Sequence, residues 1–284
     1  EPDYLIDASA MAECFQSYGS SYLHYFRRKF EPNANTHYIL LGNLANFFLD
    51  ELIFAEDHDS VSFNDTFLES FKQSPFEYTS CEDIASRAGF GLFWDSAKTQ
   101  FSNIKRVILD DFPEIGIKLH NCTLEPSFFS EKYGFQGRLD LLHKDNNQYK
   151  IIELKSGKLP YPAYDMGKIA DNHRVQTAVY RMMIDSVFGA ESRDIDAAIL
   201  YSSGVQPGSN LRFAANYQNL NKDIINMRNH LVANEHELVN GDNGVVEGMF
   251  DRLFNTTSFS KPNATFYTKK IELLEASLKQ CSAV

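Results

Sequence analysis

The sequence predicts a mixed α/β fold, in which a small central sheet carries helices on both faces and a helical region precedes it. Two apolar runs within residues 134–155 alternate as half-buried strands do, and a polar turn at Lys144–Gln148 separates them. This pattern indicates a β-hairpin. A helical pattern over 171–188 and a strand pattern over 195–203 follow. Such a mixture of strand and helix signals favours a sheet covered by helices.

The part of the chain before the hairpin is predicted to be mainly helical. Residues 7–30 predict a helix or a pair of helices, which Asp7 or Ser9 would cap. Residues 57–113 predict two or three further helices that pack on one side of the sheet. The spacing within this region favours a core stripe over a row that stacks on bases, and the stripe consists of Phe63, Phe67 and Phe71.

The elements around and after the hairpin follow from the same periodicities. Residues 115–131 predict a strand that leads into the hairpin. The 171–188 helix carries a core stripe of Val175, Val179, Met182, Met183 and Val187. A short strand is predicted over 211–214. The remaining predicted elements are helices, over 217–239, 244–254 and 265–280.

Three charged side chains are predicted to meet on one face of the hairpin. Glu153 and Lys155 lie two residues apart on the second strand, so they share a face. If the hairpin folds about the centre of its turn, Asp140 on the first strand lies opposite Glu153 to within a residue. Two close carboxylates repel each other unless a cation lies between them, and Mg²⁺ is the kind of ion they suit. The alternative is a solvated sheet face with no ligand.

These residues carry a resemblance to a known family. Asp140, followed by the Glu-Leu-Lys of 153–155, resembles the signature of the PD-(D/E)XK nucleases, and Gln176 and Tyr180 resemble the QxxxY motif of their RecB-like branch. The segments GRLD, ELKSGK and HRVQ are most similar to the nuclease domain of the Okazaki-flap helicase–nuclease and to the exonucleases of CRISPR adaptation. The resemblance covers most of the chain, thinly outside 120–205.

The resemblance implies a restriction-endonuclease-like core and a role for each motif residue. Asp140, Glu153 and the carbonyl of Leu154 would bind Mg²⁺ or Mn²⁺. Lys155 would position the attacking water or stabilise the transition state, as a preorganised cation can. Gln176 and Tyr180 would orient that lysine and the DNA backbone.

Two further positions match the family less completely. Glu125 lies where the family has a glutamate on the strand before GRLD, so it would bind the metal or orient water; a solvated strand residue is the alternative. In the strongly apolar helix over 36–56, Asn46 replaces the histidine of the family's GxxxHxxxE pattern and Asp50 replaces the glutamate. Either the metal preference shifts to Mg²⁺, or metal binding weakens, or His37 or another group replaces the histidine. The alternative is that Asn46 is an ordinary polar residue of the helix.

The family's iron–sulfur cluster is not expected here. Cys14 matches the first of its four cysteine ligands, but the stretch that should carry the other three, residues 255–264, contains no cysteine. One thiolate cannot hold a cluster that needs about four. We therefore expect Cys14 to be a buried small residue.

Local positive charge follows the hairpin. Lys158, Lys168, His173 and Arg174 lie in or just after the loop that begins behind Lys155. Their position beside the proposed metal predicts contacts with DNA phosphates, and the alternative is a solvated loop.

Composition limits the partners. The net charge of −11 argues against an extended basic surface for duplex DNA, but a narrow path for a single strand needs only a few phosphate contacts and stacking. No apolar run is long enough to span a membrane, and the scattered cysteines suit an intracellular protein in the cytoplasm or at the nucleoid.

We expect one nuclease domain over 1–284, mainly helical over 1–113, with its catalytic core over 114–205 and a C-terminal helical part over 206–284. It is expected to be a fragment of a longer protein, and the resemblance implies a helicase domain in the same or a partner chain. Because the sequence has no ATP-binding P-loop, that helicase would lie outside this sequence. The expected function is metal-dependent cleavage of single-stranded or flap DNA in replication or repair. The alternatives are a weakened module that binds and guides a strand, a subunit that only docks a helicase, and an enzyme acting on RNA.

Overall fold

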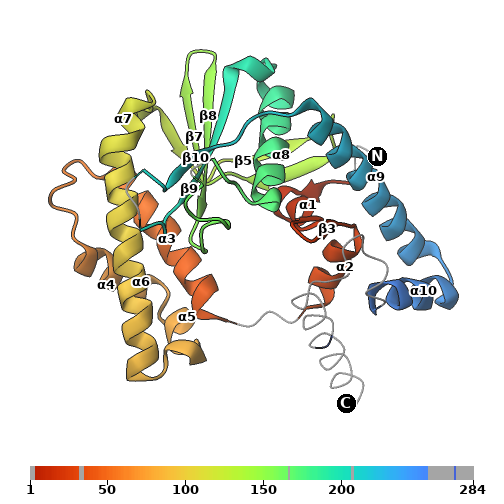
Figure 1. The fold of residues 1–284 in the computed structure, drawn as a ribbon, viewed down its shortest axis with the longest axis horizontal. Helices are drawn as coiled ribbons and strands as arrows, with labels where there is room; N and C mark the ends of the chain where they lie inside the picture. The colour runs from red at the N-terminus through yellow and green to blue at the C-terminus, as the bar shows by residue number, and fades with distance from the viewer. Residues whose placement is uncertain (1–3, 32–34, 166, 206–207, 255–271, 273–284) are drawn as a thin grey trace.

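A central mixed sheet organises the computed structural model, which describes residues 4–31, 35–165, 167–205, 208–254 and 272. The sheet has five strands in the order β10-β9-β8-β7-β4, of which β8 and β9 are parallel and the other neighbours antiparallel. In Figure 1 it lies at the centre, between two groups of helices. Its strands are β4 (Cys122–Leu124), β7 (Leu141–Asp145), β8 (Gln148–Lys155), β9 (Ile195–Tyr201) and β10 (Leu211–Phe213).

Two smaller sheets lie beside the central one. The first has three strands in the order β1-β6-β5, namely β1 (Ile6–Asp7), β6 (Phe135–Arg138) and β5 (Ser127–Ser130). The second pairs β2 (Phe15–Gln16) with β3 (Gly19–Ser20). The chain passes from β6 directly into β7, so one continuous stretch crosses from the small sheet to the central one.

The helices form two groups on opposite faces of the central sheet (Figure 1). One group comprises α3 (His37–Phe54), α4 (Phe63–Gln73), α5 (Pro75–Thr79), α6 (Arg87–Arg106) and α7 (Phe112–Glu114), with a π-helical turn over Val107–Asp111. The other comprises α1 (Ala8–Glu13), α2 (Leu23–Phe30), α8 (Asp171–Phe188), α9 (Gln218–Asn240) and α10 (Asn243–Phe254). Short 3₁₀ turns span Glu82–Ile84, Leu119–Asn121 and Ser192–Asp194.

The alternation of β8 divides the apolar core between these two groups. Ile152 and Leu154 are buried with the α3, α4 and α6 side chains on one face. Tyr149 and Ile151 are buried with α1, α8 and α9 on the other face. Successive strand residues point to opposite faces, so Glu153 lies on the same face as Ile151, toward α8.

Most of the predicted elements are confirmed with small shifts. Asp7 caps α1, as predicted, by accepting the Ser9 N–H at 2.9 Å. Residues 7–30 form a helix pair separated by the β2–β3 hairpin. The helices predicted over 36–56, 171–188, 217–239 and 244–254 and the strands over 195–203 and 211–214 are all present. The helix predicted over 265–280 lies outside the described residues, apart from position 272.

Three expectations need correction. The predicted strand over 115–131 is a 3₁₀ turn followed by β4 and β5, which belong to different sheets. Phe63 and Phe67 are buried, but Phe71 at the edge of its helix is 37% exposed. Val187 in the last turn of α8 is 45% exposed, whereas the other four residues of that stripe are buried. Phe71 and Val187 each lie in the last turn of their helix, and both are more exposed than the core stripe predicted.

The helical part before residue 113 does not form one layer. Residues 37–114 cover one face of the sheet, as predicted for 57–113, but α1 and α2 pack on the opposite face with α8. Among the described residues, no helix is long and apolar enough to cross a membrane.

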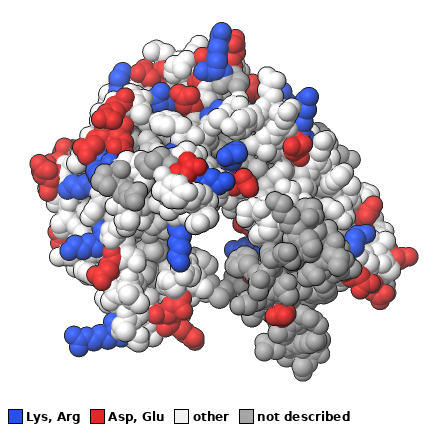
Figure 2. Space-filling model, in the orientation of Figure 1, with Lys and Arg blue, Asp and Glu red and all other residues white. Residues whose placement is uncertain are grey.

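Acidic and basic side chains are interspersed over the described surface that Figure 2 shows. No wide basic area is visible among the described residues on this face. This distribution agrees with the argument that the sequence does not encode an extended basic surface.

Gly137 lets β6 lie close to α1 and α8, and we expect this close packing to stabilise the fold. A Cβ at this position would lie 3.0 Å from the Cβ of Ala8 and 3.2 Å from Cε1 of Tyr180. We predict that Gly137→Ala lowers the free energy of unfolding by about 1–3 kcal/mol, the usual cost of overpacking. Urea denaturation measures this change.

Gly91, inside α6, is the matched control. A Cβ there meets nothing within 4 Å. Gly91→Ala should therefore raise the free energy of unfolding by about 0.5–1 kcal/mol, because alanine is the better helix former. Equal effects of the two substitutions would contradict the packing argument.

Candidate active site

Asp140 lies at the break between β6 and β7, beside the carboxyl end of β8. The register pairs Leu141 with Ile152, which places Asp140 opposite Glu153, as the hairpin predicted. The Asp140 carboxylate accepts the Leu154 N–H at 2.6 Å. Asp140 is thus just outside the strand on which the sequence placed it, where its carboxylate can bond to the neighbouring strand's backbone.

Lys155 joins β8 to α8 through a buried polar network. Its Nζ donates to Oε1 of Glu153 at 2.7 Å and to Oε1 of Gln176 at 2.9 Å. The Gln176 amide also donates to the same Glu153 oxygen at 2.7 Å. Glu153 and Gln176 are both almost fully buried. The three side chains that the motif predicted to cooperate are therefore in direct contact.

Tyr180 anchors this network from α8. Its hydroxyl donates to the carbonyl of Arg138 at 2.9 Å and accepts from the Gln176 amide at 2.8 Å. Gln176 and Tyr180 lie one helical turn apart, so a single face of α8 presents both. The hydroxyl fixes the backbone two residues before Asp140, and the amide fixes Lys155.

Burial and like charge set the protonation of the cluster. Burial, and then the charge of Glu153, raise the pKa of Asp140 well above its usual range, although Lys155 and the Leu154 N–H oppose this shift. Burial alone would lower the pKa of Lys155, but Glu153 and Asp140 outweigh it and raise that pKa. The lysine therefore remains a cation, while Asp140 binds a proton more readily than an exposed aspartate does.

The cluster has the donor set that a hard divalent cation requires. Oε2 of Glu153 is buried and has no hydrogen-bond partner among the described residues. An unpaired buried carboxylate oxygen is costly unless a cation approaches it. Mg²⁺ is typically held by one or two carboxylates plus substrate phosphates. Asp140 and Glu153 thus fit the metal that the motif implies.

The backbone carbonyl of Leu154 adds an oxygen to those of Asp140 and Glu153, on the Asp140 side of β8. Along a strand, the N–H and C=O of one residue point to the same edge, and successive residues alternate. The Lys155 carbonyl accepts from Ser202 on the β9 side, whereas the Leu154 N–H points to Asp140. The Leu154 carbonyl therefore faces the Asp140 side, just beyond the end of β7.

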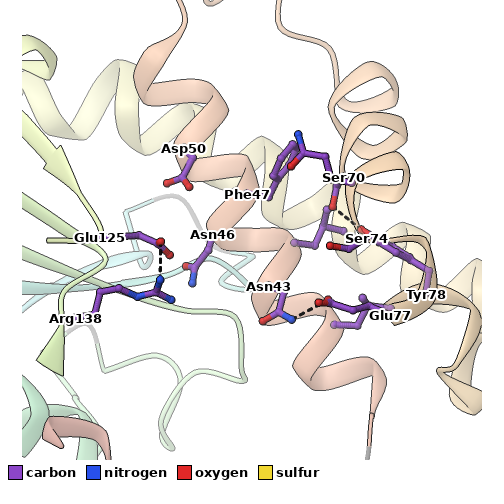
Figure 3. Close-up of a pocket in the computed structure, with 13 residues that line it drawn as sticks. Asn43, Asn46, Phe47, Asp50, Ser70, Ser74, Glu77, Tyr78, Glu125 and Arg138 are labelled. Atoms are coloured by element: carbon purple, nitrogen blue, oxygen red, sulfur yellow. Dashed lines mark hydrogen bonds and ion pairs between the residues drawn. The ribbon is translucent and has the colours of Figure 1, made fainter. Parts of the chain in front are cut away.

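Asn46 and Glu125 are brought together, but in a pocket beside this cluster (Figure 3). Glu125 occupies the turn between β4 and β5, where its N–H donates to the Asp140 carbonyl at 3.0 Å and its carboxylate pairs with Arg138 at 2.9 Å. Its φ of 49° shows a turn residue in place of the strand residue expected. Asn46 and Asp50 face it from α3.

Metal binding by Asn46 and Glu125 stays a prediction. Among the described residues, no three His, Cys, Asp or Glu side chains lie close enough together to hold a metal. Burial, and then Glu125 and Glu51, raise the pKa of Asp50 to about 6. His37 does not take over from Asn46, because it starts the same helix about 13 Å away along the axis and contacts Asp83 at 2.6 Å.

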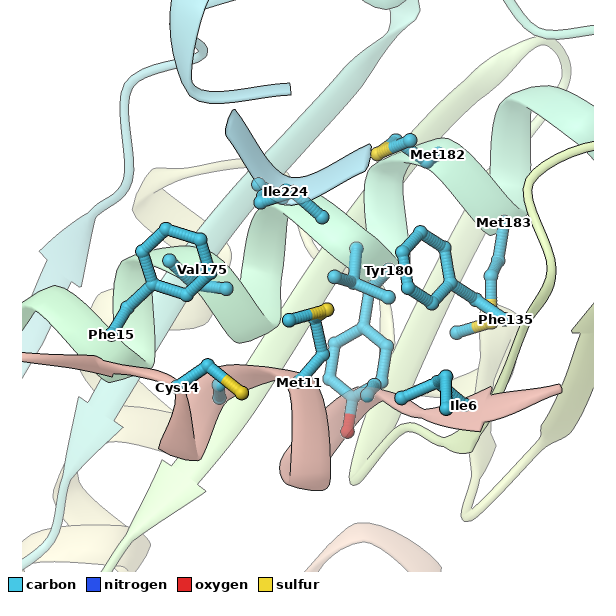
Figure 4. Close-up of a cluster of buried hydrophobic side chains, with 14 of the residues drawn as sticks. Ile6, Met11, Cys14, Phe15, Phe135, Val175, Tyr180, Met182, Met183 and Ile224 are labelled. Atoms are coloured by element: carbon cyan, nitrogen blue, oxygen red, sulfur yellow. The ribbon is translucent and has the colours of Figure 1, made fainter. Parts of the chain in front are cut away.

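Cys14 is fully buried, as expected (Figure 4). It lies near Met11, Phe15 and Tyr180 in the apolar cluster between α1 and α8. Burial raises the pKa of its thiol far above the usual range, so it stays protonated. The segment 255–264, in which the sequence lacks the other three cluster ligands, lies outside the described residues.

The loop after Lys155 is only partly as predicted. Lys158 and Lys168 are exposed. The Arg174 guanidinium lies 5.6 Å from the ring centroid of Tyr217. The expectation that His173 adds positive charge is wrong. Burial, and then the nearby Lys155, lower its pKa to about 3, and its Nδ1 contacts the Tyr201 hydroxyl at 2.9 Å.

Sequence reasoning missed the residue that holds this loop. Arg212 in β10 is almost fully buried and donates to the carbonyls of Lys168 at 2.6 Å and Ala163 at 3.1 Å. Its guanidinium also lies 5.4 Å from the ring of Tyr201. No local pattern marks Arg212, since the two loop carbonyls to which it donates lie more than forty residues away in the chain.

Comparisons with known proteins agree with this geometry. A family model of the PD-(D/E)XK nuclease superfamily matches residues 63–261. No curated protein matches the sequence significantly. Among solved structures, the chain is similar to the crystal structure of a candidate exonuclease from Eubacterium rectale, with 15% sequence identity and a TM-score of 0.50. The match covers 84% of this chain and 82% of that one. At this identity the similarity shows the fold alone. Since the family model spans most of the chain and includes the Asp140–Glu153–Lys155 cluster, the protein belongs to the PD-(D/E)XK nuclease superfamily.

Proposed function

We propose that this protein is a divalent-metal-dependent deoxyribonuclease that hydrolyses phosphodiester bonds of single-stranded or flap DNA. The observation that carries the proposal is the unpaired, buried Oε2 of Glu153 beside Asp140, in a network that keeps Lys155 charged. Such an arrangement is costly for the fold alone. It becomes favourable when a cation and a phosphate occupy the site.

The chain's own residues supply positioning and charge. When bound, the divalent ion would lower the pKa of a water and neutralise charge on the scissile phosphate. Lys155 is already held by Glu153 and Gln176, so its ammonium needs no reorganisation to stabilise the developing charge. Tyr180 keeps the Arg138–Asp140 backbone in place through its hydrogen bond to the Arg138 carbonyl.

A single strand suits the described surface better than a duplex. Acidic and basic groups alternate across the face in Figure 2, whereas duplex binding relies on many phosphate contacts from a basic surface. Lys158, Lys168 and Arg174 supply a few cations in and just after the loop that follows Lys155, which is enough to follow one strand. In this proposal the protein is the RecB-like nuclease part of an intracellular helicase–nuclease in replication or repair.

Magnesium is the proposed ion because the donors at the cluster are oxygens. Carboxylates and carbonyls suit Mg²⁺ and Mn²⁺, and Asn46 offers an amide where the family histidine would favour a softer metal. The second candidate function, a module that binds and guides a strand without cutting it, is favoured by that same substitution at Asn46. A cleavage assay distinguishes the active nuclease from the strand-guiding module.

Glu153→Gln keeps the shape of the side chain and removes its charge. We predict that cleavage of end-labelled single-stranded DNA in Mg²⁺ or Mn²⁺ falls at least about 100-fold, because the site loses charge that it needs for the ion and for Lys155. EDTA should stop the wild type. The control is Glu191→Gln, an exposed carboxylate that pairs with Arg193, and it should cut at the wild-type rate. Full activity of Glu153→Gln would exclude the assignment.

Gln176 acts through Lys155, so its removal should weaken the reaction without abolishing it. We predict that Gln176→Leu lowers kcat by about 10- to 100-fold, the usual effect of losing a supporting hydrogen bond, and leaves KM nearly unchanged. Gln176→Glu should recover part of the rate, because its carboxylate can still accept from Lys155. A KM effect with unchanged kcat would instead indicate that Gln176 binds the strand.

Asp140→Asn should separate stability from activity. In EDTA we predict a higher melting temperature than that of the wild type, because the amide can still accept the Leu154 N–H and is neutral without having to bind a proton beside Glu153. The gain should grow as pH rises above about 4, since the unfolded wild-type carboxyl then loses a proton that the folded one keeps.

Thermal unfolding with and without Mg²⁺ completes this test. Mg²⁺ should raise the melting temperature of the wild type and not that of Asp140→Asn, because only the wild type retains both carboxylates. A variant that melts below the wild type in EDTA at pH 7 would show that the repulsion is not a cost to the fold.

A further inference from the structure

A polar pocket of about 490 Å³ opens next to the catalytic cluster. It lies between α3, the α4–α5 connection and the β4–β5 turn (Figure 3). Its volume falls in the range of roughly 300–1,000 Å³ that is typical of small-molecule sites. Glu125 and Arg138 belong to its wall, and the backbone of each bonds within the site around Asp140. Whatever enters the pocket therefore lies beside the scissile phosphate.

The charges of the pocket do not suit a phosphate group. Asp50, Glu77 and Glu125 are acidic, and Arg138 is the cation among its lining residues. That guanidinium already pairs with Glu125 at 2.9 Å. A phosphate would therefore meet an excess of negative charge. Metal binding at this pocket is the alternative that the experiments below must distinguish, since Asn46 offers a metal only an amide oxygen.

The same side chains suit the edge of a nucleobase. Carboxylates accept from the amino group of cytosine, and Asn or Gln side chains pair with adenine. The side chain of Asn46 makes no hydrogen bond to another described residue, so its amide can pair with a base. Phe47, which is half-buried, adds apolar surface against which a base can lie. Asn46, Phe47 and Asp50 all come from one helix, α3, and a regular element positions side chains more precisely than a loop does.

From this chemistry we propose that the pocket receives one unstacked nucleobase of the substrate strand, and that it selects a base with an exocyclic amino group over thymine. The inference rests on the proposed nuclease function and names a feature of its substrate. The backbone of the strand would pass outside the pocket, past Lys155, while one base turns in toward α3. Cleavage would then favour certain positions within a sequence.

The first experiment maps cleavage on a mixed-sequence, end-labelled single strand under limited digestion with Mg²⁺. The wild type should show a preference of at least about fivefold for A, C or G over T at one fixed nucleotide from the cut, the discrimination expected of a single base-edge contact. Asn46→Leu should remove that preference. Asp50→Asn, which is nearly isosteric, should change it and keeps the test valid if Asn46→Leu does not fold.

The matched control is Glu51→Gln. Glu51 neighbours Asp50 on α3 but is not among the residues that line the pocket. It loses the same charge as Asp50→Asn, so it should keep the wild-type preference. A change of equal size in Glu51→Gln would mean that general charge, and not the pocket, sets the pattern, and the proposal would fail.

A binding measurement separates this proposal from the nuclease assignment. Fluorescence anisotropy in EDTA compares oligo-dC and oligo-dA with oligo-dT and needs no cleavage. If the wild type cuts nothing but binds dC or dA at least about fivefold more tightly, the nuclease function fails and the pocket stands. Equal binding of all three, with random cut positions, overturns the pocket. The pocket proposal is also overturned if the Asn46→Leu variant keeps the base preference but requires more Mg²⁺ for cleavage, because Asn46 is then a metal ligand.

Discussion

The repulsion between Asp140 and Glu153, balanced by Lys155, is the constraint on which the rest of the site depends. Each buried charge costs about several kcal/mol to remove from water, and one lysine cannot offset two carboxylates. The surrounding structure maintains the arrangement through fixed hydrogen bonds from Leu154, Gln176 and Tyr180. In a nuclease this stored cost has a use, because a cation and a phosphate relieve it on binding.

The fold meets this constraint by attaching the cluster to two rigid elements. β8 carries Glu153 and Lys155 on the face toward α8, while its other face is buried against α3 and α6. α8 supplies Gln176 and Tyr180 one turn apart. The close approach of β6 to α1 and α8 depends on Gly137, where a Cβ would lie 3.0 Å from the Cβ of Ala8 and 3.2 Å from Cε1 of Tyr180. Packing and chemistry therefore restrict the same positions.

Asp140 also lies where two differently charged environments meet. On one side are Lys155 and the loop that carries Lys158 and Lys168; on the other is the acidic pocket that α3 and the β4–β5 turn form. A strand has a negatively charged backbone and largely neutral bases, so the two environments attract different parts of it. This contrast connects the proposed nuclease function with the proposed base pocket, because the same substrate would satisfy both.

The sequence alone predicted the hairpin, its register and the meeting of Asp140, Glu153 and Lys155 on one face, because these depend on local periodicity and short spacing. Gln176 and Tyr180 were identified through the resemblance to the family's QxxxY motif. The sequence did not reveal that His173 is neutral, since that follows from burial beside Tyr201 and Lys155. The role of Arg212 and the pairing of Glu125 with Arg138 likewise arise from contacts across the fold. Local pattern specifies which groups can react, whereas their charge, their partners and the pocket beside them depend on which distant segments the tertiary structure brings together.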